Sequence, residues 1–161
     1  MVEHVRGSLG RNCCGDNMHI ELGISANVDC NDIVLEVYFD QIKLFQSTAQ
    51  EKIQTIIYDF DEDVADHELR LVMSGKNSTH TKIDSNGQIV SDVFFKINHL
   101  EFEELDMREL FCLGRRSRYS HSFNSTQPEF DDEFYGEIGC NGTVFIPFST
   151  PIYLWLNDNL E

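Results

Sequence analysis

The sequence predicts an all-β protein, a single antiparallel β-sandwich of jelly-roll type with about nine short strands and at most one short helix. Apolar residues recur at every second position along most of the chain, which is the period of a half-buried strand. Turn signals separate these segments at the spacing typical of a sandwich. The 161 residues suffice for one sizeable core and show neither a linker nor an internal repeat. A closed barrel is the alternative, whereas helical bundles and doubly wound sheets are excluded.

The strands of the first half follow from clear alternation. In 33–39 every second residue is apolar, and Asp40 and Gln41 have the composition of a tight turn into a partner strand. Segment 52–60 is rich in β-branched and aromatic residues, which favour strands. The nine predicted strands are 18–24, 33–39, 42–45, 52–60, 67–74, 89–103, 118–123, 143–148 and 152–156.

The second half departs from simple alternation. The apolar phase slips by one residue between Ile97 and Leu100, which predicts a β-bulge. Around Asp106 the spacing allows a turn or two of helix. In the last predicted strand, Tyr153 and Trp155 are two residues apart and therefore share a face. That face is a stacking platform if it is solvated and part of the core if it is internal.

The N-terminal segment and the cysteines indicate where the chain is made. Up to Asn17 no apolar run of signal-peptide length occurs, and no stretch approaches the length of a membrane span. The five cysteines are an odd number without a two-residue-spaced pair, which argues against a disulfide framework and a structural zinc site. We expect a chain kept in a reducing cytoplasm and not secreted through a signal peptide. One domain is expected over 1–161, with 1–31 as an irregular N-terminal extension.

The charge of the chain is strongly negative. Twelve Lys and Arg residues against 28 Asp and Glu residues give a formal net charge of −16. Such a domain repels phosphate backbones and anionic lipid surfaces, so neither nucleic acid nor a membrane is expected as a partner. Cations, basic protein surfaces and neutral sugars remain compatible with this charge.

One dense acidic block is a candidate Ca²⁺ site. Asp59, Asp61 and Asp63 occupy positions one, three and five of an EF-hand-like loop, where carboxylate oxygens coordinate the ion. The match then fails, because Val64 stands where Gly is required and Arg70 where a bidentate Glu is required. The alternative is a solvated loop whose Asp side chains cap the turn before the next strand.

A second acidic block, which contains Asp131 and Asp132, lies beside aromatic residues in a predicted loop. Such a loop would hold Ca²⁺ while an aromatic ring stacks on a sugar. In a sandwich, aromatic residues belong more often to the core, which is the alternative. The candidate ligand-binding residues are therefore His121, Phe134, Tyr135, Tyr153 and Trp155, and the candidate metal ligands are Asp59, Asp61, Asp63, Asp131 and Asp132.

Three arginines stand out because basic residues are few. Arg115, Arg116 and Arg118 either form local ion pairs or dock an acidic partner, including a second copy of the chain. No catalytic residue is predicted, since a Gly-rich phosphate loop, a nucleophile elbow and a paired-His zinc motif are all missing from the sequence. Glu133 and Glu137 would suit a glycosidase, but in a chain with 28 acidic residues such a pair is not distinctive.

Several strings carry a resemblance to known proteins. They are DHEL (66–69), SGK (74–76), ID (83–84), YSHSFN (119–124), GEIGCNG (136–142) and PIYLWL (151–156). From 33 to 156 the chain resembles small uncharacterised proteins of T-even-type tailed phages that infect marine cyanobacteria. The resemblance implies a protein made in the host cytoplasm that then joins the virion, and it brings no catalytic motif. The segment 1–31 has no counterpart in it.

Together these observations predict a non-enzymatic binding module. The first hypothesis is a virion-associated structural or assembly protein that docks on virion proteins or on itself. The alternative is a carbohydrate-binding, lectin-like module, with or without Ca²⁺, and a small hydrolase is the third. An assembly protein would expose an apolar patch or an intersubunit sheet edge. Sugar binding requires a concave face with exposed aromatic rings beside polar groups.

Overall fold

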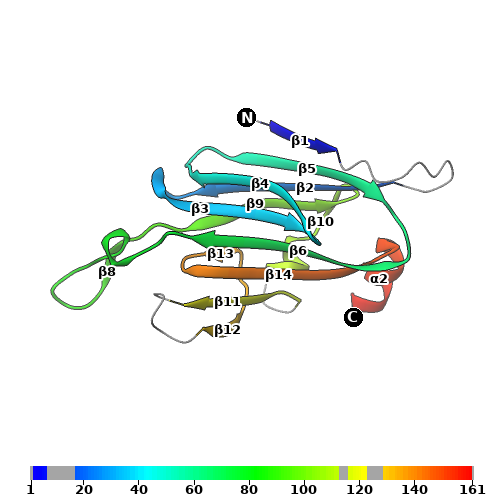
Figure 1. Ribbon diagram of the computed structural model, residues 1–161. Coiled ribbons are helices and arrows are strands. Elements are labelled where there is room, and N and C mark those ends of the chain that lie inside the picture. The colour runs from blue at the N-terminus through cyan, green and yellow to red at the C-terminus, as the bar shows by residue number, and fades with distance from the viewer. Residues whose placement is uncertain (1, 7–16, 113–115, 123–128, 161) are drawn as a thin grey trace.

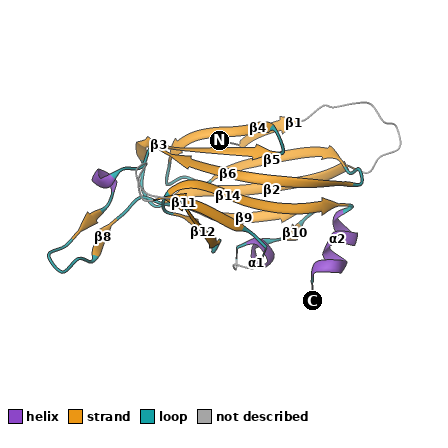
Figure 2. Ribbon diagram, turned by 60° about the horizontal axis from the view of Figure 1, so that its bottom comes forward, coloured by secondary structure: helices purple, strands orange, loops and turns teal. Residues whose placement is uncertain are grey.

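The computed structural model is a sandwich of two β-sheets (Figures 1 and 2). It describes residues 17–112, 116–122 and 129–160 and the backbone of 2–6. Sheet A has the strand order β1(Val2–Arg6), β5(Gln54–Asp61), β2(Asn17–Ala26), β9(Phe95–Phe102) and β10(Leu105–Asp106), with β13(Glu137–Ile138) also beside β9. Sheet B has the order β12(Phe130–Glu133), β11(Arg118–Ser122), β14(Asn141–Thr150), β6(Ala65–Ser74), β3(Cys30–Phe39) and β4(Ile42–Ala49). The predicted fold class, a single antiparallel β-sandwich, is confirmed.

Short elements lie at the two ends of the sandwich. The hairpin of β7(Lys82–Ile83) and β8(Ile89–Ser91) projects from one end, after the 3₁₀ turn Ser78–His80, and α2(Ile152–Asn159) lies at the other (Figures 1 and 2). Helix α1(Arg108–Phe111) follows β10, as predicted near Asp106. In the described part of the chain, every helix is too short or too polar to cross a membrane.

Alternation predicted the long strands well. The apolar residues of β3 and β6 point into one continuous core, and the turn at Asp40 and Gln41 is confirmed. Asp40 has a φ of 50°, a left-handed conformation that a short polar side chain tolerates. The described residues form fourteen strands instead of about nine, because five of these strands are only two to four residues long and too short to show a period.

The predicted β-bulge is confirmed in β9. Gly23 of β2 lies opposite His99, whereas Ile24 lies opposite Ile97. Asn98 is therefore the extra residue, and the apolar side chains on both sides of it keep pointing into the core.

The predicted last strand is wrong, because its residues begin α2. Ile152 and Leu156 are one helical turn apart and both are buried. Pro151, at the N-cap, has no N–H group for a strand neighbour. Residues two apart on a helix point to nearly opposite sides, so Tyr153 and Trp155 do not share a face.

The N-terminal segment is not an irregular extension where the structure describes it. β2 is a central strand of sheet A between β5 and β9. β1 lies at the edge of the sheet and pairs with β5 in parallel, whereas the other strand pairs among the described residues are antiparallel. Met18 and Leu22 of β2 are fully buried, so this segment contributes to the same core as the rest of the chain.

Candidate functional site

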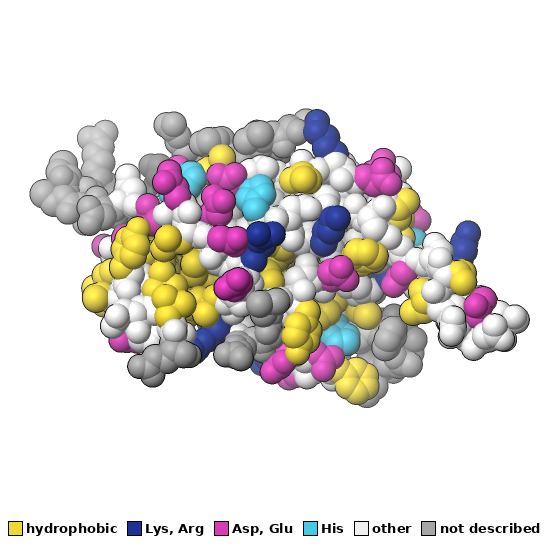
Figure 3. All heavy atoms as spheres, turned by 180° about the vertical axis from the view of Figure 1, so that it is seen from behind, with side chains coloured by type: hydrophobic (Ala, Val, Ile, Leu, Met, Phe, Trp, Pro, Cys, Tyr) yellow, Lys and Arg dark blue, Asp and Glu magenta, His cyan; other side chains and the backbone are white. Residues whose placement is uncertain are grey.

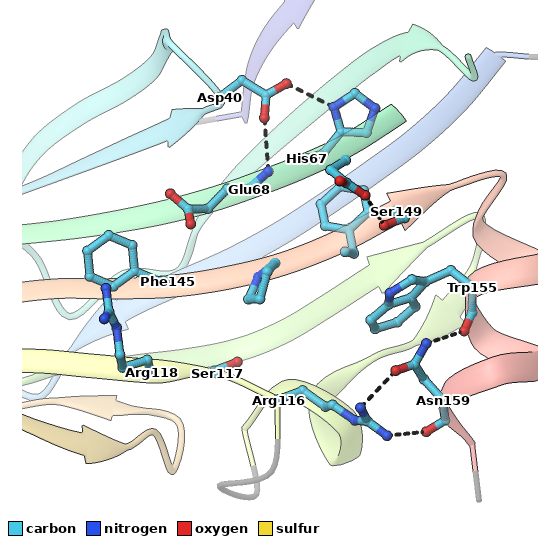
Figure 4. A pocket seen from close by; sticks show the side chains of 13 residues that line it. Asp40, His67, Glu68, Arg116, Ser117, Arg118, Phe145, Ser149, Trp155 and Asn159 are labelled. Atoms are coloured by element: carbon cyan, nitrogen blue, oxygen red, sulfur yellow. Dashed lines mark hydrogen bonds and ion pairs between the residues drawn. The ribbon is translucent and has the colours of Figure 1, made fainter. Parts of the chain in front are cut away.

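A groove with a volume of about 910 Å³ lies on the outer side of sheet B, over β14 (Figure 4). We call it the β14 groove. Asp40, Asp66 and Glu68 form one wall, which we call the acidic wall, and Arg116, Ser117 and Arg118 form the basic wall. Phe145 and Pro147 form the floor, and Trp155 and Asn159 lie at one end. The groove therefore joins segments from residue 40 to residue 159.

Unequal strand lengths create this groove. β11 begins at Arg118, opposite Phe145 of β14. On the other side β14 stays paired with β6 as far as Thr150. Among the described residues, no strand lies beside 146–150 on the β11 side. The chain turns at Pro151, and α2 folds back against β14 and bounds the hollow that the missing strand leaves.

A row of cationic and aromatic side chains crosses the outer face of sheet B and ends at the groove. Arg118, Phe145, Arg70, Tyr38 and Lys43 lie opposite one another in register on five neighbouring strands. The guanidinium carbon of Arg118 lies 4.4 Å from the centre of the Phe145 ring, and that of Arg70 lies 5.0 Å from the Tyr38 ring. The contact with Phe145 holds Arg118 over the groove floor.

Hydrogen bonds position the acidic wall. Asp40 Oδ1 accepts from the Glu68 backbone N–H at 2.9 Å, and Oδ2 lies 2.8 Å from His67 Nδ1. The Ser149 hydroxyl donates to Asp66 Oδ1 at 2.6 Å. The carboxylates of Asp40 and Asp66 therefore have fixed orientations.

His67, behind the acidic wall, makes a polar contact through each of its ring nitrogens. Its Nδ1 faces the Asp40 carboxylate, which accepts only. Its Nε2 lies 3.2 Å from Thr150 Oγ1, whose own proton is donated to the Asp63 carbonyl. The His67 ring therefore links the Asp40 carboxylate to Thr150 behind the wall.

The basic wall presents two guanidinium groups whose described partners are neutral. Arg116 donates to Asn159 Oδ1 at 2.7 Å and to the Asn159 carbonyl at 2.9 Å. Arg118 rests on Phe145. Neither arginine forms an ion pair with any residue that the structure describes. Both charges therefore remain available to the groove, while Arg115 lies outside the described residues.

Ser117, between these arginines, has an unsatisfied hydroxyl. The residue is 8% exposed, and its Oγ has no hydrogen-bond partner among the described groups. Figure 4 shows Ser117 on the wall between Arg116 and Arg118. A buried hydroxyl without a partner is costly, so Ser117 is a candidate donor to a groove ligand once its side chain turns outward.

Trp155 gives the groove an aromatic end. The indole stacks on Phe111 with 5.7 Å between ring centres and 21° between planes, which fixes its orientation. Figure 4 shows the ring reaching from α2 toward the groove. The side chain predicted as a stacking platform is thus at a cavity, although on a helix.

A second cavity, of about 550 Å³, brings together part of the predicted sugar site. His121 Nε2 lies 2.7 Å from Asp132 Oδ2, and the His121 ring stacks on Tyr119. Burial raises the pKa of the Tyr119 hydroxyl. The Tyr135 hydroxyl donates to Glu133, which raises the pKa of Tyr135. The cavity is also lined by Glu133 and Glu137, the pair considered for catalysis.

The other predicted ligand-binding residues do not join this second cavity. Phe134 is fully buried and packs edge-on against Tyr119, so its prediction as a ligand contact is wrong. Tyr153 is 60% exposed on α2 and lines neither cavity, because the helix turns it away from Trp155.

The predicted Ca²⁺ ligands are not brought together. Asp59 and Asp61 belong to β5, so the EF-hand-like loop is a strand end, with only Asp63 beyond it. Asp131 and Asp132 are neighbours on β12 and point to opposite faces. None of the five belongs to a group of three converging metal-ligating side chains within the described chain.

One such group does exist, at Cys30, Asp32 and His80, whose ligand atoms lie within 4.8 Å of one another. The hydrogen bonds of His80 oppose a metal ion there. Its Nδ1 accepts from the Asn77 backbone N–H at 3.0 Å, so the neutral ring carries its proton on Nε2, 3.4 Å from Asp32 Oδ2. A metal on Nε2 would move that proton to Nδ1, against the Asn77 N–H. We assign no ion to this group.

Sequence reasoning missed the floor of the β14 groove. Along β14, Val144, Ile146 and Phe148 point into the core, so polar side chains are expected at the positions between them. Phe145 and Pro147 occupy those outward positions instead. Apolar residues on the solvent side of an alternating strand were the signal that could have located the groove.

Comparison with known proteins yields structural neighbours only. No protein-family model matches the sequence, and no curated relative matches it. One similar solved structure is "vCBM60 in complex with galactobiose", with 11% identity, a TM-score of 0.46, and coverage of 81% of this chain and 97% of that chain. A second is a selenomethionine form of vCBM60, described as linking two families of calcium-dependent carbohydrate-binding modules, with 8% identity, a TM-score of 0.44, and coverage of 80% and 89%. With identities this low and TM-scores below 0.5, these two structures do not assign a function to this chain. The function proposed below is therefore based on the geometry of the β14 groove.

Proposed function

We propose that the protein is a non-enzymatic carbohydrate-binding module and that the sugar lies in the β14 groove. The placement of Trp155 carries this proposal, because its ring reaches into a groove that has polar walls on both sides (Figure 4). Aromatic rings beside a few oriented polar groups are the usual composition of a small-ligand site.

The groove matches the amphipathic character of a sugar. Trp155 offers apolar surface at one end and Phe145 on the floor, while carboxylates accept hydrogen bonds from hydroxyls on one wall and guanidinium groups donate on the other. From Phe145 to Ser149 the floor extends about 13 Å at about 3.3 Å per residue, which exceeds one pyranose ring. An oligosaccharide is therefore the expected ligand.

A glycan array followed by titration calorimetry tests this proposal. We expect Trp155→Ala to weaken binding by roughly tenfold or more, since about 1.4 kcal/mol corresponds to a factor of ten. The matched control is Tyr153→Ala on the same helix, which lies outside the groove and should bind like the wild type. Because Trp155 packs on Phe111, Phe145→Ala serves as a second variant whose side chain lies outside the core. Absence of any glycan signal, or unchanged binding in both groove variants, would reject the proposal.

Calcium is the second variable of that experiment. The groove carboxylates Asp40 and Asp66 already accept hydrogen bonds from protein groups, which favours a site that works without the ion. We expect equal affinities in EDTA and in CaCl₂. Loss of binding on chelation would restore the Ca²⁺-assisted alternative.

An assembly role, on a virion or between copies of the chain, is a second proposal. The observation that favours it is the solvent side of α2 with its C-cap, where Tyr153, Leu154 and Leu160 are 60%, 65% and 67% exposed. Figure 3 shows hydrophobic side chains gathered at this end of the molecule. The solution mass tests self-association: a defined oligomer that Leu154→Glu dissociates would support it, and a monomer would reject it.

A further inference from the structure

We propose that the β14 groove selects acidic sugars, with the carboxylate of a uronate residue bound against the basic wall. This inference rests on the proposed sugar-binding function and specifies the ligand class of the same site. It is carried by Arg116, Ser117 and Arg118, which lie side by side on that wall (Figure 4).

The two arginines of the wall differ from the other two arginines whose side chains the structure describes. Arg70 and Arg108 each lie close to a carboxylate, at 3.6 and 3.0 Å. Arg116 and Arg118 have none within 4.0 Å in the described part of the chain, although an acidic wall lies across the same groove. Two uncompensated positive charges therefore face one binding site.

Both guanidinium groups are oriented by neutral contacts. The two bonds from Arg116 to Asn159 use one N–H group on each terminal nitrogen, and a guanidinium has five. Arg118 lies over the Phe145 ring, a contact that leaves its N–H edge free. Oriented guanidinium groups with free N–H edges bind planar carboxylates through paired hydrogen bonds.

Ser117 adds a third donor between them. Its hydroxyl is buried and has no partner among the described groups, so the side chain can turn toward a ligand carboxylate without giving up a described contact. On the opposite wall, Asp40, Asp66 and Glu68 accept hydrogen bonds from sugar hydroxyls and repel a second anion. That wall therefore favours a ligand whose other edge carries hydroxyls. A uronate residue, with one carboxylate and several hydroxyls, satisfies both walls.

Net charge does not oppose this selection at close range. The repulsion from a molecule of charge −16 is screened beyond about 10 Å at about 0.1 M salt. A guanidinium in direct contact with a carboxylate lies well inside that distance. The local charge of the wall therefore decides the preference.

Titration with matched sugars tests the inference. Oligogalacturonate, oligoglucuronate and oligomannuronate are each compared with the neutral oligomer of the same length, which differs only at C6. We expect at least one uronate to bind roughly tenfold more tightly than its neutral counterpart. Arg118→Gln and Arg116→Gln should remove most of that preference. Arg108→Gln makes the same change of charge outside the groove and should preserve it.

Ser117→Ala separates binding from folding. It should weaken uronate binding several-fold without lowering Tm, since the hydroxyl has no partner among the groups that the structure describes. Equal or tighter binding of the neutral oligomers would overturn the inference while leaving the sugar-binding function intact. Equal loss of both sugar classes in the arginine variants would also overturn it. Failure of the wild type to bind any oligosaccharide would remove the proposed function itself.

Discussion

Gly75 and Gly87 both have left-handed backbones, with φ of 89° and 80°. A Cβ atom at Gly75 would lie 2.1 Å from the Asp32 carbonyl oxygen, whereas one at Gly87 would meet nothing within 4 Å. We expect Gly87→Ala to lower the free energy of unfolding by about 1 kcal/mol, the cost of the backbone conformation alone. Gly75→Ala should cost roughly 2–4 kcal/mol, because crowding adds to strain. Urea unfolding measures both, and equal losses would contradict the close approach at Asp32.

Cys112 links stability to pH. Burial raises the pKa of its thiol from 9.0 to about 11, so the unfolded chain loses this proton at a lower pH than the folded chain does. The stabilisation from this group is complete below pH 9 and falls as the pH rises to about 11. Two pKa units correspond to about 3 kcal/mol. Urea unfolding at a series of pH values should show a shallower alkaline loss in Cys112→Ala, and an unchanged loss would contradict this assignment.

Adjacent aromatic residues show what the sequence cannot resolve at this scale. Phe134 is fully buried and Tyr135 is 64% exposed, although both follow the same acidic block. Neither lies in a clear alternation, because β12 ends at Glu133. Which ring enters the core is decided by the path of the chain toward β13, and residue type carries no information about that path.

At the scale of elements, period two predicted the strands but misassigned α2. Ile152, Leu154 and Leu156 alternate as in a strand, while Ile152, Trp155 and Leu156 also fit the period of a helix. A short apolar run does not distinguish the two. Packing against the core selected the helix, and this also moved Trp155 to the groove and Tyr153 away from it.

Two leucine variants test the helix directly. Leu156 is 7% exposed and Leu154 is 65% exposed. We expect Leu156→Ala to lower the free energy of unfolding by roughly 2–4 kcal/mol, and Leu154→Ala by less than about 0.5 kcal/mol. On a strand the two residues would share a face and respond alike. Similar losses in urea unfolding would therefore contradict α2.

For the whole molecule, the candidate site depends on topology more than on any motif. The β14 groove combines the β3–β4 turn, β6, the start of β11, β14 and α2. The sequence identified Trp155, Arg116 and Arg118 separately, but it contains no sign that β11 starts opposite the middle of β14. Strand register between distant segments is set by the packing of the whole core. The groove could therefore be recognised only in the folded protein.

The net charge of −16 is also a property of the whole molecule, and it predicts how salt affects stability. Repulsion among the acidic side chains opposes the compact state and weakens as salt screens it. We expect Tm to rise by several degrees when NaCl increases from about 20 mM to about 500 mM at neutral pH. The same titration near pH 4.5, the sequence pI, serves as the control and should show almost no rise, because the net charge is close to zero there. A Tm that falls with salt at neutral pH would mean that the ion pairs, such as Lys76 with Asp92, contribute more than the repulsion removes.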